Sequence, residues 1–153
     1  MTLPALPMDR QAIEAWVPHR RPMLLVDRVL AVDLDAGTVI AQHDVAEGNF
    51  YFGGHFPGHP IMPGVMVVES MAQTAAVAVN ISRQKTDKET VFYFMQIERA
   101  RFRHPVLPGC ILEMRVQRLR HKAGVYVFKG QAVVGETVVA ECEFTAKVVE
   151  KTV

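Results

Sequence analysis

Residues 65–82 read VMVVESMAQTAAVAVNIS and contain neither glycine nor proline. Apolar side chains surround this segment on nearly every side, and a helix that is apolar all round is normally buried. Its valines are mediocre helix formers, so packing rather than local propensity must stabilise it. The sequence therefore predicts a long helix at the centre of the core. The few polar residues of the segment are Glu69, Ser70, Gln73, Thr74, Asn80 and Ser82.

The segments on either side of this helix have the patterns of β-strands. Residues 23–33 and 37–47 read as two strands joined by a turn at 35–37, and a charged loop over 83–90 follows the helix. Further segments at strand spacing are 91–97, 98–106, 111–122, 124–134 and 137–149. A short helix is expected over 10–17, capped by Asp9 and ended by Pro18. We expect one domain over residues 1–153, an α+β fold whose curved, mostly antiparallel sheet wraps the buried helix.

Composition excludes several classes of protein. The formal net charge is +1 at pH 7, and the basic residues are not interleaved with aromatic ones, so nucleic acid is a poor candidate partner. The two cysteines, Cys110 and Cys142, form no CxxC pair, which favours reduced thiols in a reducing compartment and no metal. The N-terminus lacks a signal-peptide pattern, and polar residues interrupt every apolar run, so no membrane span is expected. We expect a cytoplasmic protein.

The loop before the central helix carries the candidate chemistry. Residues 53–64 read GGHFPGHPIMPG, a composition that requires a shaped loop and places His55 on it. Glu69 lies in the second turn of the predicted helix, where burial would make its carboxyl retain a proton to higher pH. The first amides of the helix, at Gly64 and Val65, lack intrahelical partners and can polarise a carbonyl. A base, an acid and an oxyanion site are thus encoded within one short segment.

Two other interpretations of these residues remain open on chemistry alone. The histidines of the loop could simply satisfy backbone groups, and Glu69 could pair with a distant arginine. An unpaired carboxylate in an apolar helix is costly, however, which favours a functional role. A metal site at His55 and His59 is weaker, because Pro57 and Gly58 prevent a helical turn and no third ligand is evident.

Three blocks of the sequence resemble one family. GHFPGHPIMPGVMVVESMAQ (54–73) resembles the signature of the 3-hydroxyacyl-acyl carrier protein dehydratases, which have the hotdog fold. PHRRPMLLVDRV (18–29) and VFYFMQIERARFRHPVLPG (91–109) resemble two further blocks of that family, in the same order and at matching spacing. The sequence departs from the family pattern at Arg21, at 96–98 and at Cys110. These departures keep two settings open: fatty-acid biosynthesis, or a specialised pathway of the polyketide or aryl-polyene kind.

The resemblance implies a role for each matching residue. His55 corresponds to the histidine that removes the C2 proton, and Glu69 to the acid that protonates the departing 3-hydroxyl. Family enzymes are homodimers, often trimers of dimers, in which these two residues come from different subunits. A glutamate at position 69, where the related dehydratase–isomerases have aspartate, implies a plain dehydratase. No cofactor or metal is implied. The substrate-binding residues that we predict are Gly64, Val65, Gln73, Tyr93 and Phe56.

A basic segment is the candidate docking site for acyl carrier protein, which is acidic. Residues 99–122 hold seven arginine and lysine residues against one glutamate. Arg99, Arg101 and Arg103 alternate in sequence, which would place them on one face of a strand. Such a patch can steer an acidic carrier toward the site, although a solvated strand face explains it equally well.

Two functions other than dehydration are compatible with a hotdog fold. A hotdog acyl thioesterase would hydrolyse the thioester. The proline-rich loop and the spacing between His55 and Glu69 do not favour this function. A non-catalytic subunit that binds acyl carrier protein would have lost one of these two residues, and neither is lost.

Overall fold

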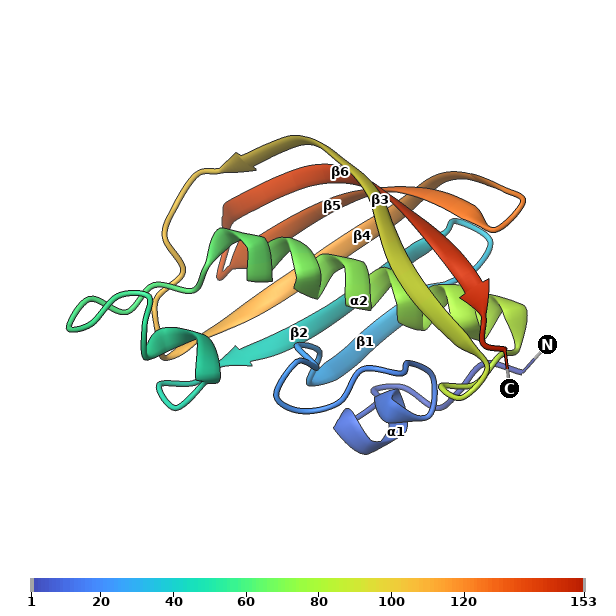
Figure 1. Ribbon diagram of the computed structural model, residues 1–153, viewed down its shortest axis with the longest axis horizontal. Coiled ribbons are helices and arrows are strands. Elements are labelled where there is room, and N and C mark those ends of the chain that lie inside the picture. Colours follow the sequence, from blue (N-terminus) through green and yellow to red (C-terminus); the bar gives the residue numbers. More distant parts are fainter. Residues whose placement is uncertain (1, 153) are drawn as a thin grey trace.

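Six strands form one antiparallel sheet that curves around a single long helix (Figure 1). The computed structural model describes residues 2–152. The strand order in the sheet is β1-β2-β4-β5-β6-β3, so β1 and β3 are its two edges. This arrangement is the α+β hotdog fold that the sequence predicts. The elements are α1 (Arg10–Glu14), β1 (Arg28–Asp33), β2 (Thr38–Val45), a 3₁₀ turn (Phe50–Phe52), α2 (Gly64–Arg83), β3 (Thr90–Phe102), β4 (Cys110–Lys122), β5 (Val125–Val134) and β6 (Thr137–Glu150).

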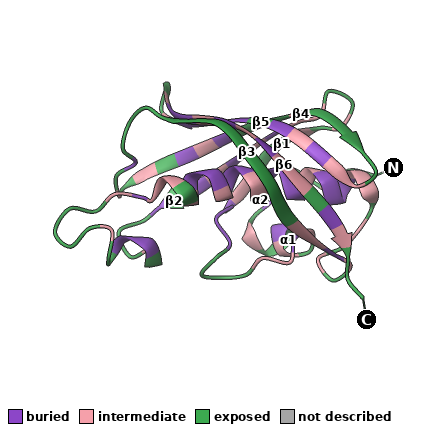
Figure 2. Ribbon diagram, turned by 45° about the horizontal axis from the view of Figure 1, so that its top comes forward, coloured by how far each residue is buried: buried purple, intermediate pink, exposed green. Residues whose placement is uncertain are grey.

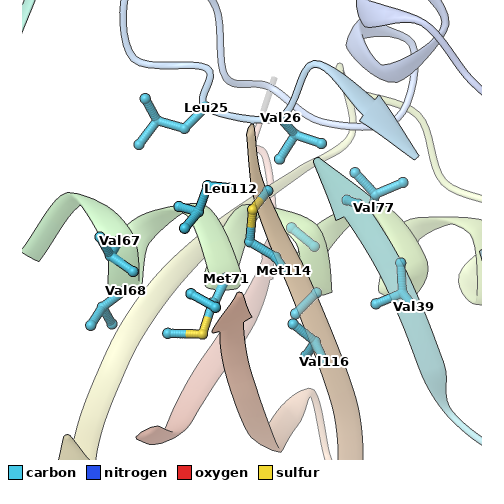
Figure 3. Close-up of a cluster of buried hydrophobic side chains, with 14 of the residues drawn as sticks. Leu25, Val26, Val39, Val67, Val68, Met71, Val77, Leu112, Met114 and Val116 are labelled. Carbon is cyan, nitrogen blue, oxygen red and sulfur yellow. The ribbon is translucent and has the colours of Figure 1, made fainter. Parts of the chain in front are cut away.

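The central helix is buried as its composition predicts. Met71, Val77 and Ile81 are fully buried, and the valines and methionines of α2 face those of the sheet (Figure 3). Gly130 of β5 permits this close packing, since a Cβ there would lie 2.7 Å from the Met71 sulfur. Among the described residues, α2 alone has the length and apolarity of a membrane-spanning helix, contrary to the expectation that no segment would. Two thirds of its most apolar window, 67 %, is buried inside the protein, which accounts for that apolarity.

Three of the predicted boundaries are wrong. The segments 91–97 and 98–106 correspond to one strand, β3. Its bulges interrupt the alternation of side chains without ending the strand, so the sequence pattern suggested two strands. The first helix ends at Glu14 rather than at Val17, because its last turn tightens before Pro18. The strand expected from residue 23 begins at Arg28, although Leu24, Leu25 and Val26 are buried.

A buried polar network anchors the segment that precedes His55. The Asp27 carboxylate pairs with Arg10 and accepts a hydrogen bond of 2.9 Å from His43 Nδ1. Burial lowers the pKa of His43 to about 4, so the ring is neutral and its Nε2 accepts from the Tyr51 hydroxyl at 2.8 Å. The Asn49 amide donates to the same hydroxyl at 2.9 Å. These bonds fix the 3₁₀ turn at 50–52, from which the chain enters the histidine loop.

Candidate active site

The backbone of its own loop orients the His55 ring. Its Nδ1 lies 2.8 Å from the Ile61 carbonyl oxygen, and a carbonyl can only accept a hydrogen bond. Nδ1 therefore carries the proton, and in the neutral ring Nε2 carries the free lone pair. The Phe56 ring stacks on the imidazole at a centroid distance of 4.1 Å. The half-buried histidine thus presents one basic nitrogen in a fixed orientation, as a general base requires.

The start of α2 lines a cavity beside His55. Gly64 lies on its wall, together with Phe102 at the end of β3 and Arg103. Pro63 supplies no side-chain cap, and no backbone hydrogen bond among the described residues uses the amides of Gly64 or Val65. A Cβ at position 64 would lie 2.8 Å from the Phe102 ring, so glycine is required there for packing as well as for access. The positive end of α2 is therefore directed toward this cavity.

The surroundings of Glu69 favour the protonated form of its carboxyl. Burial raises the pKa of its carboxyl, and a hydrogen bond from the Gln73 amide at 2.9 Å lowers it in part. Gln73 is itself fixed, because the same amide nitrogen donates to the Met23 carbonyl and its oxygen accepts from the Leu25 amide at 2.7 Å. Since Gln73 is 1 % exposed and satisfied on both atoms, it positions the carboxyl rather than exchanging protons with it.

His19, which no pattern in the sequence indicated as a site residue, lies beside this carboxyl. Its Nε2 is 3.8 Å from Glu69 Oε1, and each side chain is 20 % exposed. Its Nδ1 is buried without a hydrogen-bond partner in the described structure. Burial and the neighbouring Arg20 lower the pKa of His19, so the imidazole is neutral near pH 7. The signal that could have identified it is its place in the PHRRP block of the family resemblance.

A second cavity extends from Glu69 between α2 and the sheet. It is lined by His19, Glu69 and Gln73 at one end. The aromatic residues Phe92, Tyr93 and Phe94 of β3 form part of its wall, and Tyr93 is 57 % exposed at the surface. Most of the lining is apolar, so the cavity suits a hydrocarbon chain that begins beside the acid.

The structure divides the predicted site residues between these two cavities. His55 and Gly64 line the cavity at the start of α2, whereas Glu69, Gln73 and Tyr93 line the other. Val65, which is 72 % exposed, and Phe56 line neither. Within one chain, the base and the acid therefore do not open into a common space.

The simple alternation predicted for the three arginines is interrupted by a bulge in β3. Arg99 has a φ of 51°, and the register of β3 shifts between Glu98 and Arg101, which breaks the alternation. Arg99 pairs with Glu143 and Arg103 with Glu141, each at 2.6 Å. Acidic side chains of β6 therefore offset much of the charge that the segment shows in isolation.

Comparison with known proteins identifies this arrangement. Residues 17–143 match the FabA-like domain family. The chain is 49 % identical over 140 residues to the 3-hydroxyacyl-acyl-carrier-protein dehydratase FabZ of Roseobacter denitrificans, covering 90 % of this chain and 91 % of the relative. It is 43 % identical over 148 residues to the FabZ of Campylobacter concisus, covering 94 % of this chain and 99 % of the relative.

The fold is that of a solved dehydratase as well. The structure of the dehydratase heterocomplex ApeI:P from Xenorhabdus doucetiae superposes with a TM-score of 0.78 at 20 % identity, covering 97 % of this chain and 94 % of that one. The fold and the site define a FabA-like hotdog protein. The identities over nearly the whole length are more specific, and the chain belongs to the 3-hydroxyacyl-acyl-carrier-protein dehydratase family.

Proposed function

We propose that the chain eliminates water from a (3R)-3-hydroxyacyl thioester of acyl carrier protein through His55 and Glu69 contributed by two subunits. The amide of Gly64 holds the thioester carbonyl, which acidifies C2. His55 Nε2 takes the C2 proton while Glu69 gives its proton to the 3-hydroxyl. The C3–O bond then breaks, a trans double bond forms between C2 and C3, and water leaves. His19 is placed to accept a hydrogen bond from that water.

The exposure of the edge strand β3 supports a site made by two subunits. Tyr93, Met95, Ile97 and Phe102 are each between 47 % and 57 % exposed, and β3 is exposed along most of its length (Figure 2). A long, apolar sheet edge left free would associate with other chains. We infer that two copies pair through β3 in a twofold, isologous contact.

Antiparallel pairing of β3 with its copy would join the two halves of the site. Phe102, at the end of β3, lines the His55 cavity, and Tyr93, near its beginning, lines the Glu69 cavity. A twofold axis near Ile97 sets Tyr93 of one subunit opposite Phe102 of the partner subunit. The cavity of His55 then meets the cavity of the partner subunit's Glu69, and each dimer has two such sites. This placement of both cavities along one edge strand is the observation on which the proposal rests.

Acyl carrier protein is the partner that the reaction requires. Arg103 lines the His55 cavity, and Arg101 has no carboxylate within 4.0 Å among residues 2–152. We propose that Arg101 and Arg103, with Arg99 at the margin, receive the acidic carrier at the mouth of that cavity. Arg101→Glu should raise KM for carrier-bound substrates, but not for the same acyl group on a short pantetheine analogue. An equal rise for both substrates would refute the docking role.

The setting that we propose is the cytoplasm, in fatty-acid biosynthesis or a related pathway. Both cysteines are free, and Cys142 is buried. The apolar helix α2 lies inside the sheet rather than on a surface. These features are typical of a soluble enzyme in a reducing compartment.

Substitution of the two proposed catalytic residues tests the function. His55→Ala and Glu69→Gln should each lower kcat by about 10²- to 10⁴-fold in the hydration of crotonyl-carrier thioester, with little loss of stability. His59→Ala is the matched control, because His59 is exposed on the same loop and lines neither cavity. Wild-type turnover in either variant would refute the assignment. Release of free thiol from the 3-hydroxyacyl substrate would indicate a thioesterase instead.

A further inference from the structure

The Glu69 cavity follows one face of α2. Its helical lining residues are Glu69, Ala72, Gln73, Ala75, Ala76 and Val79, which recur at the three- and four-residue spacing of a single helix face. The three alanines leave space where larger side chains would fill it. From position 69 to position 79 the helix rises about 15 Å. The cavity is therefore a groove that begins at the acid and ends at Val79.

A partition of three buried side chains closes the far end of this groove. Val79, Tyr126 and Phe128 are 4 %, 6 % and 3 % exposed. The two rings lie parallel, with a centroid distance of 6.1 Å and an interplanar angle of 7°. Neighbouring rings hold them in place, since Tyr126 also stacks on His121 and Phe128 on Phe144. The partition is thus rigid on the strand side, and Val79 alone completes it from the helix.

A separate cavity lies behind the partition. The same three residues, Val79, Tyr126 and Phe128, also line this cavity. Its remaining wall includes the polar residues Thr38, Ser82 and Arg118. A hydrocarbon chain that passed the partition would therefore leave an apolar groove for a partly polar space, which is unfavourable.

We propose that Val79, Tyr126 and Phe128 set the longest acyl chain that the enzyme accepts, an inference that rests on the proposed dehydratase function. The groove of about 15 Å loses about 4 Å to van der Waals contact with the partition. With C–C bonds of about 1.5 Å, each methylene advances an extended chain by about 1.25 Å. About nine carbons then fit beyond C3, so substrates of up to about 12 carbons are accommodated.

A ladder of 3-hydroxyacyl-carrier thioesters from C4 to C16, assayed together by mass spectrometry, tests this inference. The wild-type kcat/KM should fall by about tenfold or more between C12 and C16. Val79→Ala opens the partition and should raise the C16-to-C8 ratio of kcat/KM by about tenfold, with C4 turnover within about twofold of wild type. Ala76→Val fills the groove three residues earlier, about 4.5 Å, and should move the limit to about C8.

Val77→Ala is the matched control. It removes the same two methyl groups from the same helix, but Val77 is fully buried and lines neither cavity. It should lower stability and leave the chain-length profile unchanged. If Val79→Ala does not fold, Phe128→Leu opens the same partition from the sheet. A wild-type enzyme that converts C16 as well as C8, or an unchanged ratio in a folded Val79→Ala or Phe128→Leu variant, overturns the inference. Absence of product at every chain length would overturn the dehydratase function itself.

Discussion

Mixing two inactive variants tests whether each site spans two subunits. In a dimer of one His55→Ala chain and one Glu69→Gln chain, one site carries both substitutions and the other carries neither. Each homodimer retains only about 10⁻² to 10⁻⁴ of wild-type activity, because every site has lost its base or its acid. The purified mixed dimer should therefore have about half of the wild-type activity per dimer, a gain of about 50-fold or more over either parent.

The assay is hydration of crotonyl-carrier thioester by mixed dimers that carry two different affinity tags and are purified on both. A matched control pairs wild type with a chain that bears both substitutions. Both sites of that mixed dimer lack one residue, so its activity should be as low as that of the parents. If His55 and Glu69 acted within one chain, the first mixture would stay inactive and the control would keep half its activity. That pair of results would refute the pairing of β3 edges.

Three further perturbations follow from the contacts of the site. Gln73→Ala leaves the buried Leu25 amide and the Met23 carbonyl without their partner, so the free energy of unfolding should fall by about 1–3 kcal/mol in urea titrations. The same variant removes the hydrogen bond that lowers the pKa of Glu69, so this pKa should rise. Because the proposed acid acts in its protonated form, the alkaline limb of the pH–kcat/KM profile should move to higher pH. A shift to lower pH would contradict this role. Gly64→Ala brings a Cβ within 2.8 Å of the Phe102 ring and should lower kcat/KM by about tenfold or more, with partial recovery when Phe102→Ala is added. Tyr51→Phe leaves the His43 nitrogen unpaired and should cost about 1–3 kcal/mol by thermal unfolding, whereas an unchanged Tm would show that the hydroxyl is not needed.

Much of the fold follows from local sequence patterns. The helix predicted over 65–82 is α2 within one residue at each end, and the turn at Gly37 falls where expected. These features depend on side-chain periodicity and on glycines with positive φ, which neighbouring residues encode. The continuous β3 was missed because its bulges interrupt the two-residue period on which strand prediction depends.

The candidate site was predicted only in part, for a related reason. The sequence placed His55, Gly64 and Glu69 in one segment, and Gln73 one helical turn beyond the acid. It could not show that His19 lies 3.8 Å from Glu69, because fifty residues separate them in the chain. It also overstated the charge around Arg99 and Arg103, whose partner glutamates lie on a distant strand that pairs with theirs.

The sequence by itself determined that a buried helix would be wrapped by a sheet and that a histidine loop and an acid would stand at that helix's first turns. Those properties are local, because the burial of a helix and the shape of a proline-rich loop depend on residues adjacent in the chain. Only the tertiary structure decided that His55 and Glu69 open into separate cavities along β3, and that Tyr126 and Phe128 close the groove behind the acid. Side-chain periodicity indicates which face of a segment is apolar, but contacts between distant segments depend on how the whole sheet curves and packs.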